Sequence, residues 1–166
     1  MKKLRVGVIG VGHLGQHHAR LYAGLPGATL VGVCDIDAKR AQAVADRYAT
    51  SVYSDANALL SRVDAVSVAV PTSAHYAVVK RCLEAGAHVL VEKPIAMTPT
   101  EAWDLATAAN MHRRVLQVGH IERFNPAIRA VRPYIDKPAF IECHRLSPFG
   151  ERGTDVDVVL DLMVHD

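Results

Sequence analysis

Short valine-rich runs alternate with alanine-rich helical segments between residues 4 and 118, and this alternation constrains the fold more than any other feature of the chain. Strands that are buried on both faces of a parallel sheet read as continuous apolar runs, and a helix connects each strand to the next. The sequence therefore predicts an α/β fold, a doubly wound parallel sheet of about six strands. We expect strands at 4–9, 29–34, 65–70, 88–91 and 115–118, and helices at 13–23, 38–48, 74–84 and 98–111.

The regular alternation stops after Gly119, and prolines become frequent. We therefore place a domain boundary near residue 120, between a first domain at 1–120 and the beginning of a second, α+β domain at 121–166. Because the chain ends at Asp166, inside the last predicted helix, we expect this second domain to be truncated. Its expected elements are a helix at 126–134, a strand at 139–146 and a helix from about residue 156.

A glycine series marks the first predicted strand-to-helix turn. Gly10-Val11-Gly12-His13-Leu14-Gly15 matches the G-x-G-x-x-G pattern of Rossmann domains, between a strand and a helix. Gly10 permits the tight turn, Gly12 lets the backbone approach a pyrophosphate, and Gly15 lets the helix pack close to the sheet. The free amides at the helix N-terminus favour the anion. A lone match is also compatible with a turn that only connects a strand to a helix.

Asp35 ends the second predicted strand, twenty residues after Gly15. A carboxylate at this place can accept hydrogen bonds from both ribose hydroxyls of the adenosine half. Asp35 could instead cap the following turn, but strand, turn, helix, strand and acid in this order indicate dinucleotide binding. The carboxylate repels a 2′-phosphate and no arginine directly follows it, so NAD is favoured over NADP, although Lys39 and Arg40 lie close in the sequence.

Charge and cysteine content argue against several other classes of protein. The formal net charge is only +2 and the basic residues are scattered, so we expect no nucleic acid partner. The apolar stretches have the length of strands and the N-terminus lacks a signal-peptide pattern, so we expect a cytoplasmic protein without a membrane partner. Cys34, Cys82 and Cys143 are far apart in apolar patterns, as reduced thiols are, and no metal-binding spacing is visible.

Polar residues follow three of the predicted strands, at the edge of the sheet where ligands of doubly wound folds bind. They are Pro71, Thr72 and His75 after the strand at 65–70, Glu92 and Lys93 after 88–91, and Arg123 and Asn125 after 115–118. We expect all three groups to face the nicotinamide half of the cofactor. A lysine in a partly desolvated cleft can take part in proton transfer, which makes Lys93 a catalytic candidate. It could also be a surface lysine paired with Glu92.

Asp161 and His165 lie four residues apart on the last predicted helix, and hence on one face. A carboxylate placed in this way can orient an imidazole for acid–base chemistry. Two polar residues on the wet face of an amphipathic helix would show the same spacing without any function, so the spacing alone leaves both interpretations open. His13, His17 and His18, by contrast, are expected to be exposed helix residues and not metal ligands.

Together these segments resemble the glucose-fructose oxidoreductase and inositol dehydrogenase family. The resemblance covers the whole chain and rests on the glycine series, Pro71-Thr72-Ser73-Ala74-His75, Glu92-Lys93-Pro94 and the pair Asp161 and His165. It implies that Lys93, Asp161 and His165 line the substrate site, with His165 as the general base. It also implies that Thr72 and His75 border the nicotinamide, and that Arg123 and Asn125 lie near the substrate.

The segment 118–126 resembles the members of this family that oxidise nucleotide-linked amino sugars, such as UDP-N-acetylglucosamine 3-dehydrogenases. Family members continue far beyond the histidine that matches His165, into an antiparallel sheet that forms the far wall of the substrate site and often the dimer interface. The resemblance therefore implies a homo-oligomer, and it implies that this chain lacks most of the substrate wall.

The sequence thus predicts an NAD-dependent oxidoreductase that oxidises a hydroxyl of a sugar or nucleotide sugar, in which His165, oriented by Asp161 and assisted by Lys93, accepts the proton. Two alternatives stay open: a module that binds NAD without turnover, and a family member that uses NAD transiently for hydrolysis or elimination at a sugar. The expected cofactor-binding residues are Gly10, Gly12, His13, Leu14, Gly15, Asp35, Pro71, Thr72, His75, Glu92 and Lys93.

Overall fold

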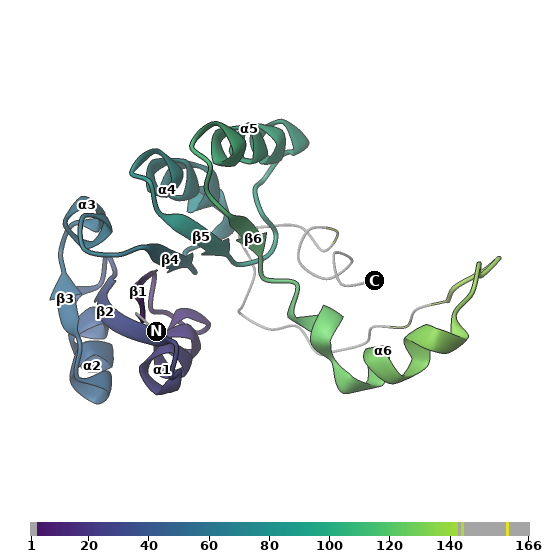
Figure 1. Cartoon of the computed structure of the whole chain (residues 1–166), viewed down its shortest axis with the longest axis horizontal. Helices are drawn as coiled ribbons and strands as arrows, with labels where there is room; N and C mark the ends of the chain where they lie inside the picture. Colours follow the sequence, from purple (N-terminus) through teal and green to yellow (C-terminus); the bar gives the residue numbers. More distant parts are fainter. Residues whose placement is uncertain (1–2, 143, 145–158, 160–166) are drawn as a thin grey trace.

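A computed structural model describes residues 3–142, 144 and 159 of the chain (Figure 1). Within these residues, parallel strands form one six-stranded sheet in the order β3-β2-β1-β4-β5-β6. The order reverses between β1 and β4, which is the point where doubly wound sheets bind their ligands. The predicted Rossmann architecture is therefore confirmed. The strands are β1 (Leu4–Ile9), β2 (Ala28–Cys34), β3 (Ser51–Tyr53), β4 (Ala65–Val68), β5 (His88–Val91) and β6 (Leu116–Val118).

Helices cover both faces of this sheet (Figure 1). One face carries α1 (Gly15–Gly24) and α2 (Ala38–Tyr48), and the other carries α3 (Ala56–Leu60), α4 (Thr72–Glu84) and α5 (Pro99–Met111). Each face has its own apolar core, because side chains of buried strands alternate between the two faces. The first core includes Val8, Val33, Ala41 and Val44, and the second includes Val66, Val68, Leu59, Leu83 and Leu105.

The sequence located most of these elements, but not the third strand or the short helix α3 that follows it. The strands expected at 4–9 and 88–91 and the helix expected at 38–48 coincide with β1, β5 and α2. β3 has only three residues and pairs with β2 alone, at the edge of the sheet. Such a short strand has too few residues to show a periodic pattern, and its stability comes from pairing with β2 rather than from local sequence.

A capping box, which the sequence Thr98-Pro99-Thr100-Glu101 indicates, begins α5. The Thr98 hydroxyl accepts a hydrogen bond from the Glu101 amide at 3.2 Å, and the Glu101 carboxylate accepts one from the Thr98 amide at 3.1 Å. The same carboxylate oxygen also accepts from the Met97 amide at 3.1 Å. These bonds fix the path of the chain between the end of β5 and α5, and so they support the loop that carries Lys93.

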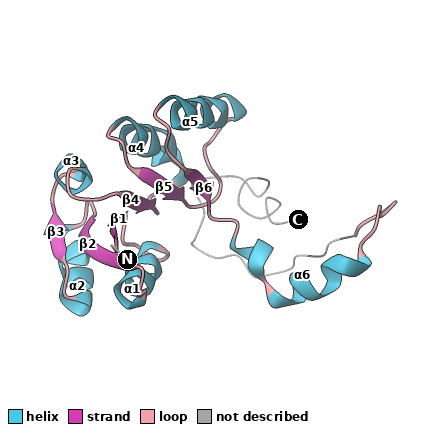
Figure 2. Ribbon diagram, in the orientation of Figure 1, coloured by secondary structure: helices cyan, strands magenta, loops and turns pink. Residues whose placement is uncertain are grey.

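The chain extends away from the sheet after β6 (Figure 2). The helix expected at 126–134 ends earlier as an α-helix, α6 (Pro126–Val131), and continues as a 3-10 turn, η2 (Arg132–Tyr134). The strand expected at 139–146 is wrong for its described residues, 139–142 and 144, which form no strand. A strand needs a neighbour for its backbone hydrogen bonds, and none of the described residues pairs with this segment. The helix expected from residue 156, with Asp161 and His165, lies outside the described residues apart from Val159.

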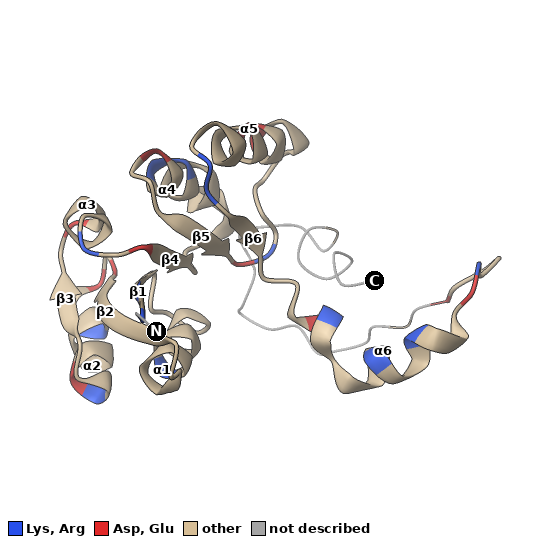
Figure 3. Cartoon of the chain, viewed as in Figure 1, with Lys and Arg blue, Asp and Glu red and all other residues tan. Residues whose placement is uncertain are grey.

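Acidic and basic residues are interspersed along the ribbon and do not gather in one part of the sheet domain (Figure 3). In the part of the chain that the structure describes, no helix combines the length and the apolar character that crossing a membrane requires. Cys34 and Cys82 are buried free thiols, and burial raises the pKa of Cys82 to about 12. Both cysteines are therefore in the neutral thiol form at physiological pH.

Replacing the capping threonine tests whether the box stabilises the domain. We expect Thr98→Ala to lower the free energy of unfolding by about 1 kcal/mol, because the Glu101 amide loses its acceptor. Urea denaturation followed by circular dichroism measures the change. Thr107→Ala is the control, since this threonine is exposed within the same helix. An equal midpoint for Thr98→Ala and the wild type would contradict the role given to the cap.

Candidate functional site

A cavity of about 720 Å³ lies at the carboxyl ends of β1, β2, β4 and β5. Its wall combines the turn after β1, the end of β2 and the segments that follow β4 and β5. Ten of the expected cofactor-binding residues line it: Gly10, Gly12, His13, Leu14, Asp35, Pro71, Thr72, His75, Glu92 and Lys93. The structure thus brings together residues that are far apart in the sequence, at the place where the fold class positions a ligand.

The glycines of the first turn have distinct tasks in the structure. Gly10 has a φ of +81°, and a Cβ on it would approach the Ala69 carbonyl oxygen to 2.6 Å. A Cβ on Gly15 would collide with the Gly10 carbonyl oxygen, so Gly15 supports the turn from beneath. At Gly12 a Cβ would have only the tip of Arg40 near it, at 3.5 Å. The backbone at Gly12 is therefore open toward the cavity, as the approach of a pyrophosphate requires.

Asp35 connects the glycine turn to the end of β2. Its side chain is 4% exposed, and its two oxygens accept hydrogen bonds from the Val11 amide at 2.7 Å and the Asp37 amide at 2.9 Å. Each carboxylate oxygen has a further lone pair, so Asp35 can still accept from a ligand hydroxyl. The carboxylate therefore fixes the turn and offers acceptors to the cavity at the same time.

Arg40 lies beside Asp35 at this end of the cavity. Its Nη1 is 3.7 Å from Asp35 Oδ2, and its Nη2 is 3.3 Å from Asp37 Oδ2. Hydrogen bonds from the Arg40 and Lys39 amides, together with the Arg40 charge, hold the pKa of Asp37 below its ordinary value although partial burial opposes them. Two carboxylates thus engage the guanidinium that lies nearest to Gly12.

His75 connects the two loops that follow β4 and β5. The ring is 1% exposed, with Nδ1 at 2.7 Å from the Pro94 carbonyl oxygen and Nε2 at 3.0 Å from the Val70 carbonyl oxygen. Both carbonyl oxygens are acceptors for a ring N–H, and the ring lies between them. His75 therefore connects the two loops within the cavity wall.

Glu92 and Lys93 follow β5, and both are half-buried in the cavity wall. Glu92 Oε2 accepts a hydrogen bond from the Lys93 amide at 3.3 Å, and Oε1 lies 2.8 Å from His18 Nε2. Burial by itself would raise the pKa of Glu92, but the His18 hydrogen bond and charge and the Lys93 amide and charge outweigh it, so the pKa lies below its ordinary value. Glu92 is therefore ionised at neutral pH.

The expectation that His18 is an exposed helix residue is wrong. His18 is half-buried on α1, where Nδ1 lies 3.0 Å from Ser67 Oγ and Nε2 lies 2.8 Å from Glu92. Its position three residues after Gly15 and four before Tyr22 places it on the sheet-facing side of the helix, and this spacing was the available signal. His13 and His17 are exposed as expected, and their rings meet edge to face with the ring centroids 5.9 Å apart.

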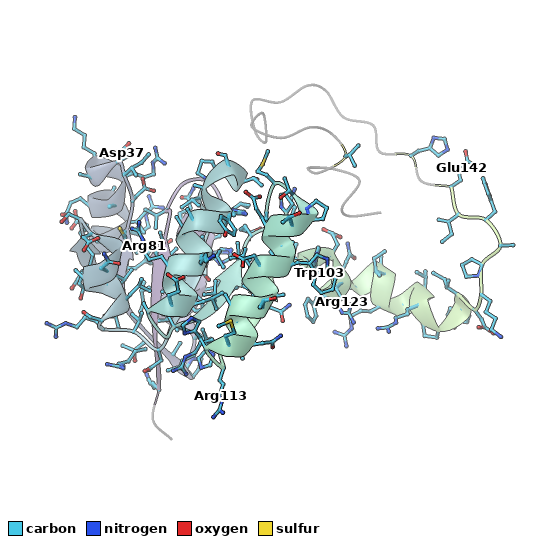
Figure 4. The ribbon with its side chains drawn as sticks, turned by 90° about the horizontal axis from the view of Figure 1, so that it is seen from above. Asp37, Arg81, Trp103, Arg113, Arg123 and Glu142 are labelled. Carbon is cyan, nitrogen blue, oxygen red and sulfur yellow. The ribbon has the colours of Figure 1, made fainter. Side chains whose placement is uncertain are left out.

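Arg123 and Asn125 are not among the described residues that line the cavity. Asn125 Oδ1 accepts from the Ala127 amide at 2.9 Å, so this side chain caps α6, and its Nδ2 donates to Glu122 at 2.8 Å. Arg123 lies in the exposed 3-10 turn η1 (Ile121–Phe124), and Figure 4 places it by the α6 segment, on the other side of the domain from Asp37. The structure therefore gives Asn125 a local structural task and brings neither residue to this cavity.

Three polar residues that line the cavity were not singled out from the sequence at all: Ser54, Asp55 and Arg81. Asp55 caps α3 by accepting from the Asn57 amide at 3.2 Å, and it follows the unrecognised strand β3. Without that strand, no sequence signal places Ser54 and Asp55 at a strand end. Arg81 is an exposed residue in the last turn of α4 and belongs to no sequence motif.

Removing the imidazole of His75 tests its connecting role. We expect His75→Ala to lower the free energy of unfolding by roughly 2 to 4 kcal/mol, because the buried ring loses its contacts with the Pro94 and Val70 carbonyl oxygens and a cavity opens. Midpoint and slope of urea denaturation measure the loss. His112→Ala, at an exposed histidine after α5, is the matched control. If both variants unfold at the same urea concentration, His75 does not hold the loops.

Comparison with known proteins identifies relatives over the whole chain. Residues 4–120 match the family described as an oxidoreductase family with an NAD-binding Rossmann fold. A UDP-N-acetylglucosamine 3-dehydrogenase of Acidithiobacillus ferrooxidans is 44% identical over 167 residues, with 100% of this chain and 53% of that protein covered. An inositol 2-dehydrogenase of Rubrobacter xylanophilus is 34% identical over 175 residues, with 99% of this chain and 50% of that protein covered.

Solved structures show the same similarity. The UDP-N-acetylglucosamine 3-dehydrogenase GnnA from Acidithiobacillus ferrooxidans matches with a TM-score of 0.92 and 44% identity, over 99% of this chain and 54% of that chain. GenD2 from gentamicin A biosynthesis, solved in complex with NAD, matches with a TM-score of 0.78 and 29% identity, over 81% of this chain and 39% of that chain. The chain spans about half the length of the curated relatives it matches.

Proposed function

The chain belongs to the glucose-fructose oxidoreductase and inositol dehydrogenase (Gfo/Idh/MocA) family of NAD-binding Rossmann-fold oxidoreductases, and we propose that it supplies the cofactor-binding part of a sugar or nucleotide-sugar dehydrogenase. One observation carries this proposal: the glycine turn, Asp35 and Lys93 line a single cavity at the switch point of the sheet. A dinucleotide site and a basic side chain suited to proton transfer thus share one wall.

We propose a nucleotide-linked amino sugar, oxidised at C3, as the substrate. The support is the higher identity to a UDP-N-acetylglucosamine 3-dehydrogenase, 44%, than to an inositol 2-dehydrogenase, 34%. A homo-oligomer is part of the same proposal, because Ile121, Phe124 and Ile128 are exposed large apolar side chains after β6. Exposed apolar side chains in such a run favour association.

The residues of this chain have separate tasks in the proposed reaction. The turn from Gly10 to Gly15 and the N-terminus of α1 bind the pyrophosphate, and Asp35 accepts from the adenosine ribose hydroxyls. NAD, when bound, supplies the hydride acceptor. Lys93 orients the substrate hydroxyl and assists its deprotonation, for which His165, oriented by Asp161, is the proposed base.

The surroundings of Asp35 support NAD as the preferred cofactor. A 2′-phosphate would lie beside this carboxylate, and the nearest cation, Arg40, is already engaged by Asp35 and Asp37. The phosphate would therefore have to displace two carboxylates from the guanidinium, at a cost in affinity.

Neutralising Asp35 tests this preference. We expect Asp35→Asn to weaken NAD binding about tenfold, the size of one charged hydrogen bond, and to strengthen NADP binding because the repulsion is removed and Arg40 is released. Isothermal titration with each cofactor measures both constants. Asp46→Asn, at an exposed aspartate on α2, should change neither. An unchanged ratio of the two affinities in Asp35→Asn would contradict the assignment.

Turnover tests the proposed reaction itself. The full-length protein, purified and given NAD and UDP-N-acetylglucosamine, should produce reduced nicotinamide, which its near-ultraviolet absorbance reports. Product without net reduction would indicate hydrolysis or elimination, and NAD binding without any product would indicate a binding module. Either result would overturn the proposal.

The lysine at the end of β5 gives a sharper test. We expect Lys93→Ala to keep NAD affinity within about twofold of the wild type while turnover falls by 10² to 10⁴, the range of general acid–base contributions. Lys80→Ala is the control and should turn over normally, because the Lys80 ammonium pairs with Asp104 at 2.7 Å between α4 and α5 and does not line the cavity. A normal rate in Lys93→Ala would remove this residue from the mechanism.

A further inference from the structure

We propose that His18 is a positioning residue for Lys93: its imidazole holds the Glu92 carboxylate, and Glu92 holds the Lys93 backbone amide at the cavity wall. The inference rests on the function proposed above, in which Lys93 meets the substrate. His18 does not line the cavity and its ring contacts Ser67 and Glu92, so its task is separate from binding phosphate.

A continuous chain of hydrogen bonds connects the interior of the sheet to the Lys93 loop. Tyr22 Oη lies 2.7 Å from Ser67 Oγ, which lies 3.0 Å from His18 Nδ1, and His18 Nε2 lies 2.8 Å from Glu92 Oε1. The last bond runs from the Lys93 amide to Glu92 Oε2 at 3.3 Å. This series of hydrogen bonds thus begins on α1, crosses β4 and ends at the backbone of Lys93.

Every member of this hydrogen-bond series has a partner. Ser67 Oγ lies between Tyr22 Oη and His18 Nδ1 and can donate to one while it accepts from the other, and His18 Nε2 donates to the Glu92 carboxylate. Ser67 is 0% exposed, and no buried side-chain polar atom of the described residues lacks a partner. Because buried hydroxyls without partners are costly, Ser67 and Tyr22 fix the ring orientation and with it the direction of the Nε2–H bond.

Glu92 is held from several sides. A Cβ on Gly119, at the end of β6, would approach Glu92 Oε2 to 3.3 Å, so the carboxylate packs closely against this strand end. Among the described residues, His18 on α1 and Lys93 on the same loop are the titratable groups that act on Glu92. Gly119, which packs against the same carboxylate, contributes no titratable group. Removing the His18 ring therefore takes away the side-chain donor that, within the described part of the chain, fixes Glu92.

Four variants resolve the contribution of each bond. His18→Ala removes the donor to Glu92, and His18→Gln restores it, because the glutamine amide nitrogen lies near the position of Nε2. Ser67→Ala removes the partner of Nδ1, and Tyr22→Phe removes only the outermost bond. If this series of hydrogen bonds positions Lys93, the effects of the substitutions on amide exchange and turnover decrease in the order His18→Ala, Ser67→Ala, Tyr22→Phe. His18→Gln then behaves nearly as the wild type.

The first readout does not depend on turnover. Hydrogen exchange of the Lys93 amide, followed by NMR, should be at least tenfold faster in His18→Ala than in the wild type and close to normal in His18→Gln. His112→Ala, at an exposed histidine after α5, is the control and should leave this amide unchanged. Equal exchange in His18→Ala and the wild type would overturn the inference, even in a protein that does not oxidise a sugar.

The second readout uses turnover in the protein that reduces NAD. We expect kcat to fall roughly ten- to hundredfold in His18→Ala, with the KM for NAD within about twofold, because a misplaced reacting group slows the chemical step without removing the cofactor site. The hydrogen bond from His18 lowers the pKa of Glu92, so its loss raises that pKa and moves the acid limb of kcat to higher pH.

The two readouts separate the two proposals. Absence of sugar-dependent NAD reduction in the wild type overturns the proposed function, while amide exchange still decides the role of His18. Turnover that is equal in His18→Ala and the wild type, with an unmoved acid limb, overturns the positioning role and leaves the proposed function intact. A loss of turnover in His18→Ala that His18→Gln does not restore also overturns the positioning role of His18.

Discussion

The close packing of the Gly10 turn against the end of β4 is the constraint on which the rest of the site depends. A side chain at Gly10 would press on the Ala69 carbonyl oxygen, and one at Gly15 would collide with the Gly10 carbonyl oxygen. Because neither position has room for a Cβ, α1 begins directly at the edge of the sheet. The helix N-terminus, the strand ends and the loops after them therefore converge on one small volume, where a charged ligand can contact all of them.

Two polar connections fix this convergence from opposite ends. At the adenosine end, Asp35 joins the turn to β2 through the Val11 amide. At the other end, His75 joins the loops after β4 and β5 through their carbonyl groups. Both side chains are almost entirely buried, so each bond forms in a medium of low dielectric constant, where its loss is costly. The cavity is thus shaped by strand-end residues before any ligand enters.

The parts of the site that local sequence determines were predictable, and the parts that depend on distant contacts were not. The glycine turn, Asp35 and the capping box at Thr98 each involve residues close in sequence or a spacing set by one βαβ unit. The partners His18 and Glu92 are 74 residues apart, and Ser67 and His18 are 49 apart. No periodic pattern encodes such pairs, since they arise only when β4 and β5 take their places beside β1.

The placement of His18 gives α1 two roles that one rigid element can join. Its N-terminus faces the glycine turn, and one turn further along, its sheet-facing side carries the donor to Glu92. An α-helix transmits position along its axis with little deformation because its backbone bonds act together. Any displacement of α1 on binding a pyrophosphate would therefore reach Glu92, and through Glu92 the backbone of Lys93. Cofactor binding and the placement of the proposed catalytic lysine would then be coupled through a single helix.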